Sequence, residues 1–237
     1  MDDAPESNEL FLFLASTAHD MKNSVSVLSG TLETLLAQAA PTSASEAAYP
    51  QMAHMLYQTK RLNDNLIQLL ALYKQVGKPA YPFDMQPLAM GDLVAQVAGA
   101  SRVLLDSRHI KLETQADPEL VWHVDEDLIV GVLGHAINNA IHYTKDTIRL
   151  AIEVVDGDLD IRIEDNGGGY SNAMLEAGVS AMHGASAGVN FLTNSTGLGL
   201  YFSSEVAKMH KHRQRSGRLR LENGGAYGGA CFVLSLP

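Results

Sequence analysis

Four short segments of the chain carry residue types and spacings that suit chemistry. The first is Ala18-His19-Asp20-Met21-Lys22-Asn23. A carboxylate beside an imidazole accepts the proton of one ring nitrogen and makes the other nitrogen a better nucleophile. Asn23 lies one helical turn after His19, where it could orient a phosphoryl group or a water molecule. The alternative is an ordinary solvated helix face, because surface His-Asp pairs are common.

The second segment, residues 134–144, places two polar side chains on one face of a helix. His135 and Asn139 are four residues apart, and apolar residues fill the opposite side. An amide oxygen is a neutral, hard ligand that suits Mg²⁺ held mainly by water and phosphate. The alternative is a helix end with polar caps, which explains the asparagines but not the shared face.

The third segment is Asp165-Asn166-Gly167-Gly168-Gly169. Apolar residues alternate along 159–163, and continuing the alternation puts Asp165 on the inward side of a strand. A carboxylate there is costly unless it accepts hydrogen bonds, and an adenine amino group is a suitable donor. Gly167 and Gly169 permit a tight turn and close approach of a ligand. The alternative is a simple Asp-Gly turn.

The fourth segment, Ser195-Thr196-Gly197-Leu198-Gly199-Leu200, opens a helix. Glycine-rich backbone at a helix N-terminus presents free N–H groups and the positive end of the helix dipole to a phosphate. A stretch of small residues at 171–194 precedes it and could act as a lid over a nucleotide.

The first 75 residues contain the helices that must position the His-Asp pair. Apolar residues recur at alternating spacings of three and four in two stretches separated by a loop composition at 40–46. Two helices of about 30 residues, each roughly 45 Å long, cannot bury both sides of their seams in a single hairpin. We expect a second copy of the chain to complete an antiparallel four-helix bundle; the alternative is packing on the C-terminal part of the same chain. The seam positions are Phe11, Leu14, Ala18, Met21, Val25, Leu28, Leu32 and Leu35, and then Met52, Met55, Thr59, Leu62, Leu66, Leu69 and Tyr73.

The segment Gly77-Lys78-Pro79-Ala80-Tyr81-Pro82 interrupts the helical pattern and is typical of a linker. From about residue 85 the pattern is mixed, which predicts an α+β domain with helices on one face of a sheet. Asp125 is expected to cap the central helix, and Asp156-Gly157 to turn a hairpin. The expected helices are 92–105, 125–143 and 197–209, and the expected strands are 110–114, 121–124, 147–155, 159–164, 217–221 and 230–236.

Composition narrows the classes of function. Seventeen Lys and Arg against 27 Asp and Glu give a formal charge of −10, which argues against a general binder of nucleic acid or anionic membranes. Cys231 is the only cysteine, so an intrachain disulfide is impossible and a cysteine-based metal site is implausible. The acidic N-terminus does not suit a targeting peptide, and no apolar run reaches the roughly 20 residues of a membrane span. We therefore expect a cytoplasmic location.

A basic segment at 208–220 stands out in this acidic chain. It contains Lys208, Lys211, Arg213, Arg215, Arg218 and Arg220. One interpretation is docking to an acidic partner or to the helical hairpin. The other is a solvated helix end, where cations are favoured by the helix dipole.

Taken together, the four segments resemble the motif boxes of the two-component sensor histidine kinases, in the same order and spacing. The resemblance runs from about Leu10 to Pro237. Residues 19–23 resemble the phosphoacceptor box, 139–144 the asparagine box, 165–169 the Asp-x-Gly-x-Gly box and 197–200 the second glycine box. The ending at 228–237 is similar to the final strand of the family's ATP-binding domain.

The resemblance implies a fold of class α + (α+β). It implies a helical hairpin for dimerisation and histidine phosphotransfer at 1–76, which forms a dimeric four-helix bundle. A linker at 77–86 would follow, and then an α/β-sandwich, Bergerat-type ATP-binding domain at 87–237.

The resemblance also implies roles for residues. His19 would attack the γ-phosphate of ATP, Asp20 would orient and deprotonate it, and Asn23 would support dephosphorylation of the partner regulator. Asn139 would hold Mg²⁺, and Asp165 would accept the adenine amino group. The full set of nucleotide-binding positions would be His135, Asn139, His142, Tyr143, Lys145, Asp165, Gly167, Gly169, Thr196, Gly197, Leu198, Gly199 and Leu200.

The chain departs from the family pattern at several positions. Ser24 stands where a proline is often found, and only Phe191 remains of the lid's aromatic element. His135 replaces the first asparagine of its box, and His142 replaces the usual lysine. Lys145 is a candidate substitute for the missing phosphate-facing charge.

The implied function is an ATP-dependent protein-histidine kinase that acts as a homodimer through residues 10–75. Its partner would be the receiver domain of a response regulator. Residues 1–9 are too few for a sensing domain, so we expect the input from a separate sensor protein or from the first helix, unless a sensor has been cut away. One alternative is a histidine phosphotransfer or adaptor protein with a degenerate, non-catalytic ATP-binding-like domain. Another is an ATPase or serine kinase of the same fold without a histidine step.

Overall fold

The structure is a computed structural model that describes residues 83–177 and 198–237 continuously. In the N-terminal part it describes residues 25, 27–32, 34, 35, 51, 52, 54–56, 58, 59 and 62. The chain divides into two units, Met1–Pro82 and Phe83–Pro237, with the second unit beginning inside the expected linker.

Every described residue of the first unit is helical, in the stretches 25–35 and 51–62. Four large apolar side chains at the expected seam positions are exposed there: Leu28 by 57%, Leu35 by 48%, Met55 by 57% and Leu62 by 57%. The remainder of the expected hairpin, and its pairing with a second copy, lie outside the described residues. Val27, which is not a seam position, is exposed by 69%, and Leu56, also outside the seam, is fully buried. Large exposed apolar side chains in both stretches are typical of a surface that a partner covers.

The second unit is built on a five-stranded sheet in the order β2-β4-β5-β9-β8. The strands are β2 (Lys111–Gln115), β4 (Thr147–Val155), β5 (Asp158–Asp165), β8 (Arg218–Gly224) and β9 (Gly229–Leu236). Strand β2 pairs with β4 in parallel, and the other neighbours are antiparallel. The β4–β5 hairpin turns at Asp156 and Gly157, whose φ values are +53° and +78°. Two successive left-handed residues match the twist of antiparallel strands, as the Asp-Gly pair predicts.

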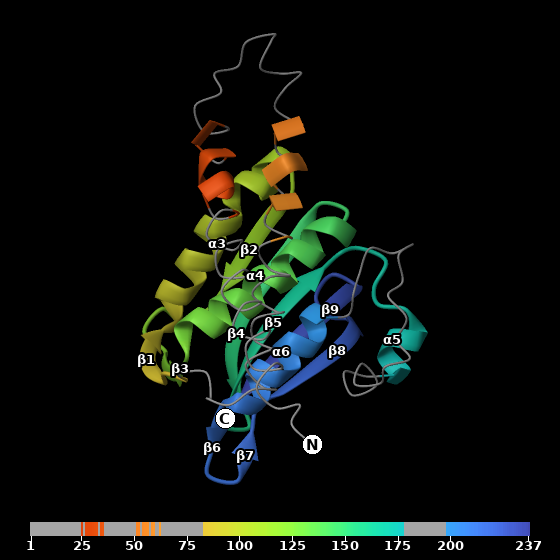
Figure 1. Ribbon diagram of the computed structural model, residues 1–237. Helices are drawn as coiled ribbons and strands as arrows, with labels where there is room; N and C mark the ends of the chain where they lie inside the picture. The colour runs from red at the N-terminus through yellow and green to blue at the C-terminus, as the bar shows by residue number, and fades with distance from the viewer. Residues whose placement is uncertain are drawn as a thin grey trace, which may run out of the picture. The chain divides into compact units, whose positions relative to one another are not determined.

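Three helices lie over one face of the sheet, as Figure 1 shows: α3 (Met90–Ser107), α4 (Glu126–Tyr143) and α6 (Leu198–Met209). The expected cap of α4 is present, because Asp125 Oδ1 accepts the Leu128 N–H at 3.1 Å. Between helices and sheet, Leu133 and Ile137 of α4 and Ile161 of β5 are completely buried. A short helix, α5 (Asn172–Ala177), follows β5. This two-layer α/β sandwich is the architecture expected for the C-terminal part.

Two strand pairs differ from the sequence-based expectation. Strand β1 (Gln86–Ala89) pairs with β3 (Val121–Val124), whereas the sequence predicts no strand before residue 110. The basic segment is not a helix end throughout: beyond Lys208 it turns into a hairpin of β6 (Lys211–His212) and β7 (Arg215–Ser216). The two strands of this hairpin have two residues each, which is too short to establish an alternating pattern in the sequence.

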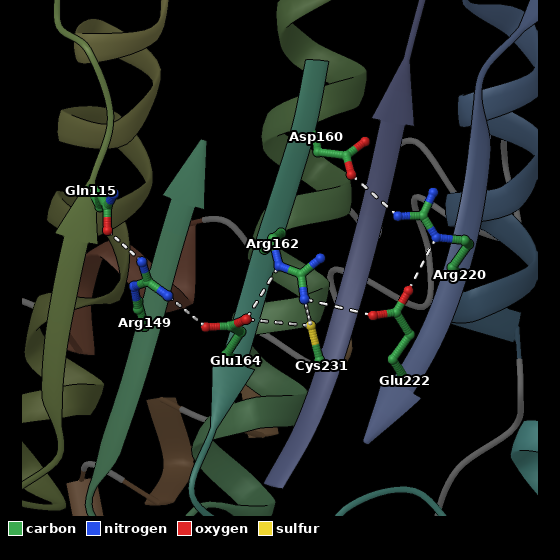
Figure 2. A network of polar contacts seen from close by, with 8 residues as sticks. All are labelled: Gln115, Arg149, Asp160, Arg162, Glu164, Arg220, Glu222 and Cys231. Atoms are coloured by element: carbon green, nitrogen blue, oxygen red, sulfur yellow. Dashed lines mark hydrogen bonds and ion pairs between the residues drawn. The ribbon is translucent and has the colours of Figure 1, made fainter. Parts of the chain in front are cut away.

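The face of the sheet turned away from the helices carries a network of paired charges (Figure 2). Glu164, only 2% exposed, accepts hydrogen bonds from Arg149 Nη1 at 2.9 Å and Arg162 Nε at 3.2 Å. Burial opposes ionisation, but the two arginines outweigh it and hold the pKa of Glu164 below its usual value. Arg220 extends the network to Asp160 and Glu222, each at 3.1 Å.

Cys231 lies within this network rather than in the apolar core. Arg162 Nη2 donates to its sulfur at 3.1 Å, and the thiol donates to Glu164 Oε1 at 3.7 Å. Burial raises the pKa of the Cys231 thiol to about 12. The cysteine is therefore a neutral, inert member of the network.

Candidate functional site

Asp165 ends β5 on the helix-facing side, where the alternation of the strand predicts it. The residue is only 4% exposed. Its Oδ1 accepts two backbone N–H groups, from Gly167 at 2.7 Å and from Ala230 at 3.1 Å. Its Oδ2 has no hydrogen bond to any residue in the described ranges. One oxygen thus fixes the carboxylate and the other remains a strong acceptor.

Two glycines let the backbone close around this carboxylate. A Cβ at Gly167 would lie 2.2 Å from the carbonyl oxygen of Tyr143, at the end of α4. A Cβ at Gly229 would lie 2.3 Å from the carbonyl oxygen of Asp165 and 2.4 Å from its Oδ1. No side chain can be accommodated at either position. Gly167 was expected in the site from the sequence, whereas Gly229 was seen only as part of the final strand.

Asn166 joins the end of α4 to the end of β5. Its Oδ1 accepts from Thr144 Oγ1 at 2.8 Å and from three backbone N–H groups: Lys145 at 3.1 Å, Asp146 at 3.2 Å and Thr147 at 3.3 Å. Its Nδ2 donates to Asp146 Oδ1 at 2.8 Å. One side-chain amide oxygen thus serves as the hydrogen-bond acceptor for the backbone N–H groups of the loop after α4. Sequence reasoning missed this role because these donors lie about 20 residues away along the chain.

Asn223 of β8 holds the glycine loop that follows Asp165. Its Oδ1 accepts the Tyr170 N–H at 2.7 Å, and its Nδ2 donates to the Tyr170 carbonyl at 2.8 Å. Gly169 adopts φ +78°, and a Cβ there would meet Asn223 Oδ1 at 2.8 Å. Burial raises the pKa of Tyr170. No local pattern in the sequence indicates that Asn223 pairs with the backbone of Tyr170.

His135 and Asn139 meet on one face of α4, as their spacing predicts. Asn139 Nδ2 lies 2.9 Å from His135 Nε2, in a partly buried setting. At the end of the helix the rings of His142 and Tyr143 form an edge contact with centroids 4.6 Å apart. His142, Tyr143 and Lys145 are all exposed, so they are accessible to a ligand.

Helix α6 begins against His135. Gly199 is buried, and a Cβ there would lie 1.8 Å from His135 Nε2. Leu198 is the first residue of the helix, and Leu200 is buried in the core. Thr196 and Gly197, together with the expected catalytic residues His19, Asp20 and Asn23, lie outside the described residues.

The described contacts therefore bring three of the four sequence segments together. Gly167 meets the end of α4, Gly199 meets the middle of α4, and Asp165 is held by the backbone of β9. This arrangement presents an anchored carboxylate, an amide and a helix start around the C-terminal half of α4. Such groups suit a base, a cation and phosphates respectively.

The donor set is compatible with Mg²⁺ but not with a metal cage formed by the protein alone. Within the described ranges, no three His, Cys, Asp or Glu side chains gather as metal ligands. The Asn139 amide oxygen is one hard ligand, and Mg²⁺ commonly takes one or two protein ligands with phosphates and water completing its shell. A nucleotide-bound Mg²⁺ therefore fits these residues.

Comparison with known proteins agrees with this geometry. Residues 124–237 match the family described as histidine kinase-, DNA gyrase B-, and HSP90-like ATPase. The chain is 26% identical to the sensor-like histidine kinase SenX3 of Mycolicibacterium smegmatis, covering 95% of this chain and 56% of that protein. It is 24% identical to the phosphate regulon sensor protein PhoR of Pseudomonas aeruginosa, covering 85% of this chain and 45% of that protein.

Among solved structures, full-length ShkA in complex with AMPPNP aligns with a TM-score of 0.58 and 20% identity, covering 94% of this chain and 45% of that chain. The chain spans about half the length of the curated relatives named above. Among the described residues, no helix has the length and apolar character needed to cross a membrane. The ATPase-domain match and the sensor-kinase relatives identify the same group of proteins that the four sequence segments indicate. Residues 124–237 therefore form an ATPase domain of the histidine kinase-, DNA gyrase B-, and HSP90-like family, and over most of its length the chain is similar to sensor histidine kinases.

Proposed function

We propose that this chain is an ATP-dependent protein-histidine kinase that phosphorylates its own His19. The phosphoryl group would then pass to an aspartate in the receiver domain of a response regulator. The observation that carries the proposal is the state of Asp165, a residue only 4% exposed: one carboxylate oxygen is anchored by two backbone N–H groups, and the other accepts no hydrogen bond from any residue in the described ranges. An adenine amino group can satisfy that acceptor.

Different residues of the site would bind different parts of ATP. Asp165 would accept from the adenine amino group, and Gly167 and Gly229 keep that position free of side chains. Tyr143 would pack on the nucleotide, while His142 and Lys145, exposed beside it, would face phosphate. The start of α6 at Leu198 would direct backbone N–H groups toward the phosphates, together with Thr196 and Gly197.

Asn139 would hold Mg²⁺ through its amide oxygen. Bound Mg²⁺ neutralises charge that develops on the phosphates during transfer. The protein's part is to present one neutral oxygen in a fixed orientation and to position the γ-phosphate for attack.

The chemical step needs a nucleophile, which the resemblance assigns to His19. A ring nitrogen of His19 would form a P–N bond to the γ-phosphorus while the bond to the ADP oxygen breaks. Asp20 would accept the proton from the other ring nitrogen. In the second step the P–N bond breaks as a receiver aspartate forms an acyl phosphate, and Asn23 would help to place water when that acyl phosphate is hydrolysed.

A homodimer through residues 10–75 is part of the proposal. The exposed Leu28, Leu35, Met55 and Leu62 support it, because a second copy of the same seam would cover them. A separate sensor protein as the source of input and a cytoplasmic location stay predictions from the sequence.

The test is incubation of the full chain with ATP labelled at the γ-phosphate. We expect an acid-labile, alkali-stable label that disappears in His19→Ala and in Asp165→Asn. His54→Ala, at an exposed histidine of the same unit, is the matched control and should keep the label. Label that survives His19→Ala would contradict the proposed phosphorylation site.

The same preparation separates the alternatives. A phosphotransfer or adaptor protein with a degenerate domain should show no binding of Mg-ATP, and the replacements at His135 and His142 are what favour it. An ATPase without a histidine step should release phosphate at the same rate in His19→Ala as in the wild type.

A further inference from the structure

We propose that His135 is a positioning residue for the cation side of this site. It determines which atom of the Asn139 amide is available to a metal, and its ring is the surface against which α6 packs at Gly199; we call this contact the seat of α6. The inference rests on the proposed binding of Mg-ATP and concerns only how this chain's own residues prepare for it.

The first argument is the orientation of the Asn139 amide. Its Nδ2 lies 2.9 Å from His135 Nε2. An amide NH₂ only donates hydrogen bonds, so the ring nitrogen must be the acceptor and the ring proton must be on Nδ1. With the nitrogen engaged, Oδ1 is on the opposite side of the amide, and it makes no hydrogen bond to any residue in the described ranges. Only this oxygen can bind Mg²⁺.

The same contact argues that His135 is not itself a metal ligand through Nε2, because that lone pair is already used by the amide. Without the ring, nothing among the described contacts distinguishes the two ends of the Asn139 amide. A turn of the amide by 180° would then direct NH₂ toward the cation. Partners of this kind, which orient a ligand without touching the metal, typically contribute 10- to 100-fold to metal affinity.

The second argument is the contact between the ring and α6. A Cβ at Gly199 would lie 1.8 Å from Nε2, 2.1 Å from Cε1 and 2.6 Å from Cδ2 of His135. The helix backbone therefore rests directly on the edge of the ring, and only glycine is compatible with it. Within α6, Ser203 Oγ also donates to the Gly199 carbonyl at 2.8 Å. One ring thus contacts both the amide and the helix that begins at the phosphate-facing segment.

The first experiment measures ATP affinity by calorimetry with the full chain, once in excess Mg²⁺ and once in EDTA. In His135→Ala we expect the gain in affinity due to Mg²⁺ to shrink about tenfold or more, with the affinity in EDTA nearly unchanged. His135→Gln, which can return an acceptor oxygen near the position of Nε2, should recover most of the gain. Gly134→Ala is the matched control, since a Cβ there would meet nothing within 4 Å.

Two results would overturn the orientation argument. One is an undiminished Mg²⁺-dependent gain in His135→Ala, and the other is an equal loss in Mg²⁺ and in EDTA, which would indicate a merely structural histidine. Absence of ATP binding by the wild type in either condition would instead refute the proposed function.

The second experiment tests the seat of α6 by a steric pair. Gly199→Ala should weaken ATP binding at least tenfold because its methyl group collides with the ring. Combining it with His135→Ala removes the obstacle, so the double variant should bind ATP more tightly than Gly199→Ala alone. If the losses of ATP-binding free energy in Gly199→Ala and His135→Ala simply add in the double variant, the proposed contact between the His135 ring and α6 is overturned, because only residues in contact depart from additivity.

Discussion

His210, the residue that follows α6, offers a quantitative test of how the second unit is held together. The side chain is 1% exposed. Its Nδ1 donates to the Val206 carbonyl at 2.8 Å, and its Nε2 accepts the Asp125 N–H at 3.1 Å. Its ring also meets that of Phe83 edge-on, with centroids 4.9 Å apart. The residue thus connects the end of α6 to the cap of α4 and to the first residue of the unit.

The perturbation is His210→Ala, with His210→Gln as the milder companion. The alanine variant leaves a buried donor at Asp125 without its partner and removes a packed ring. An unsatisfied buried group costs about 1–3 kcal/mol, and the lost packing adds to it. We therefore expect the unfolding free energy at neutral pH to fall by about 2–4 kcal/mol.

The pH dependence gives a sharper expectation. Burial holds the pKa of His210 below 6.5, although the Val206 carbonyl and Asp125 act in the opposite direction. As the pH falls through 6.5, the unfolded chain takes up this proton before the folded chain does, so the wild type loses stability. Above that pH both states are neutral at this residue and its titration contributes nothing. One such histidine gives a slope of at most about 1.4 kcal/mol per pH unit.

The assay is urea unfolding followed by tryptophan fluorescence. The chain has a single tryptophan, Trp122, which lies in β3 and so reports the Phe83–Pro237 unit. The difference in unfolding free energy between wild type and His210→Gln should be constant above about pH 6.5 and narrow below it, because titrations shared by both proteins cancel. A difference that stays flat down to about pH 5.5 would refute the assignment of a buried neutral histidine.

Two further predictions concern the sheet and the glycines. Glu164→Gln should lower the unfolding free energy by about 2–4 kcal/mol, because it removes a buried charge from two arginines. Glu222→Gln is the comparison: its side chain is 41% exposed, and the variant should lose less than about 1 kcal/mol. Equal losses in the two variants would contradict the argument that burial makes the Glu164 pairs stronger. Gly229→Ala should abolish ATP binding measured by calorimetry, because its methyl group would displace Asp165; retained binding would contradict the close approach of Gly229 to Asp165. Gly134→Ala should instead raise the unfolding free energy by about 0.5–1 kcal/mol, because alanine has the higher helix propensity.

Much of the fold was predictable where the determining chemistry is local. The cap at Asp125, the turn at Asp156-Gly157 and the long helices and strands depend on neighbours within a few residues. The inward position of Asp165 follows from the alternation of its own strand. These features are encoded in residues that are adjacent in sequence, and a single sequence is enough to recognise them.

The remaining features depend on partners that are distant in sequence. Asn223 lies next to Tyr170, and His210 next to Asp125, only because the sheet and helices bring them there. Gly229 is required because it passes Asp165, which no local pattern indicates. The roles of His19, Asp20 and Asn23 stay predictions from the sequence and the family.

The paired charges on the sheet's outer face also constrain how this surface can change in evolution. Glu164, Asp158 and Glu222 each contact two arginines, so a substitution at any of them affects two partners at once. Selection should therefore remove single substitutions in this network, while simultaneous substitutions of paired residues should persist. Among relatives, these charged residues should change together, and a chimera that exchanges only some members of a pair should be less soluble or give a lower yield.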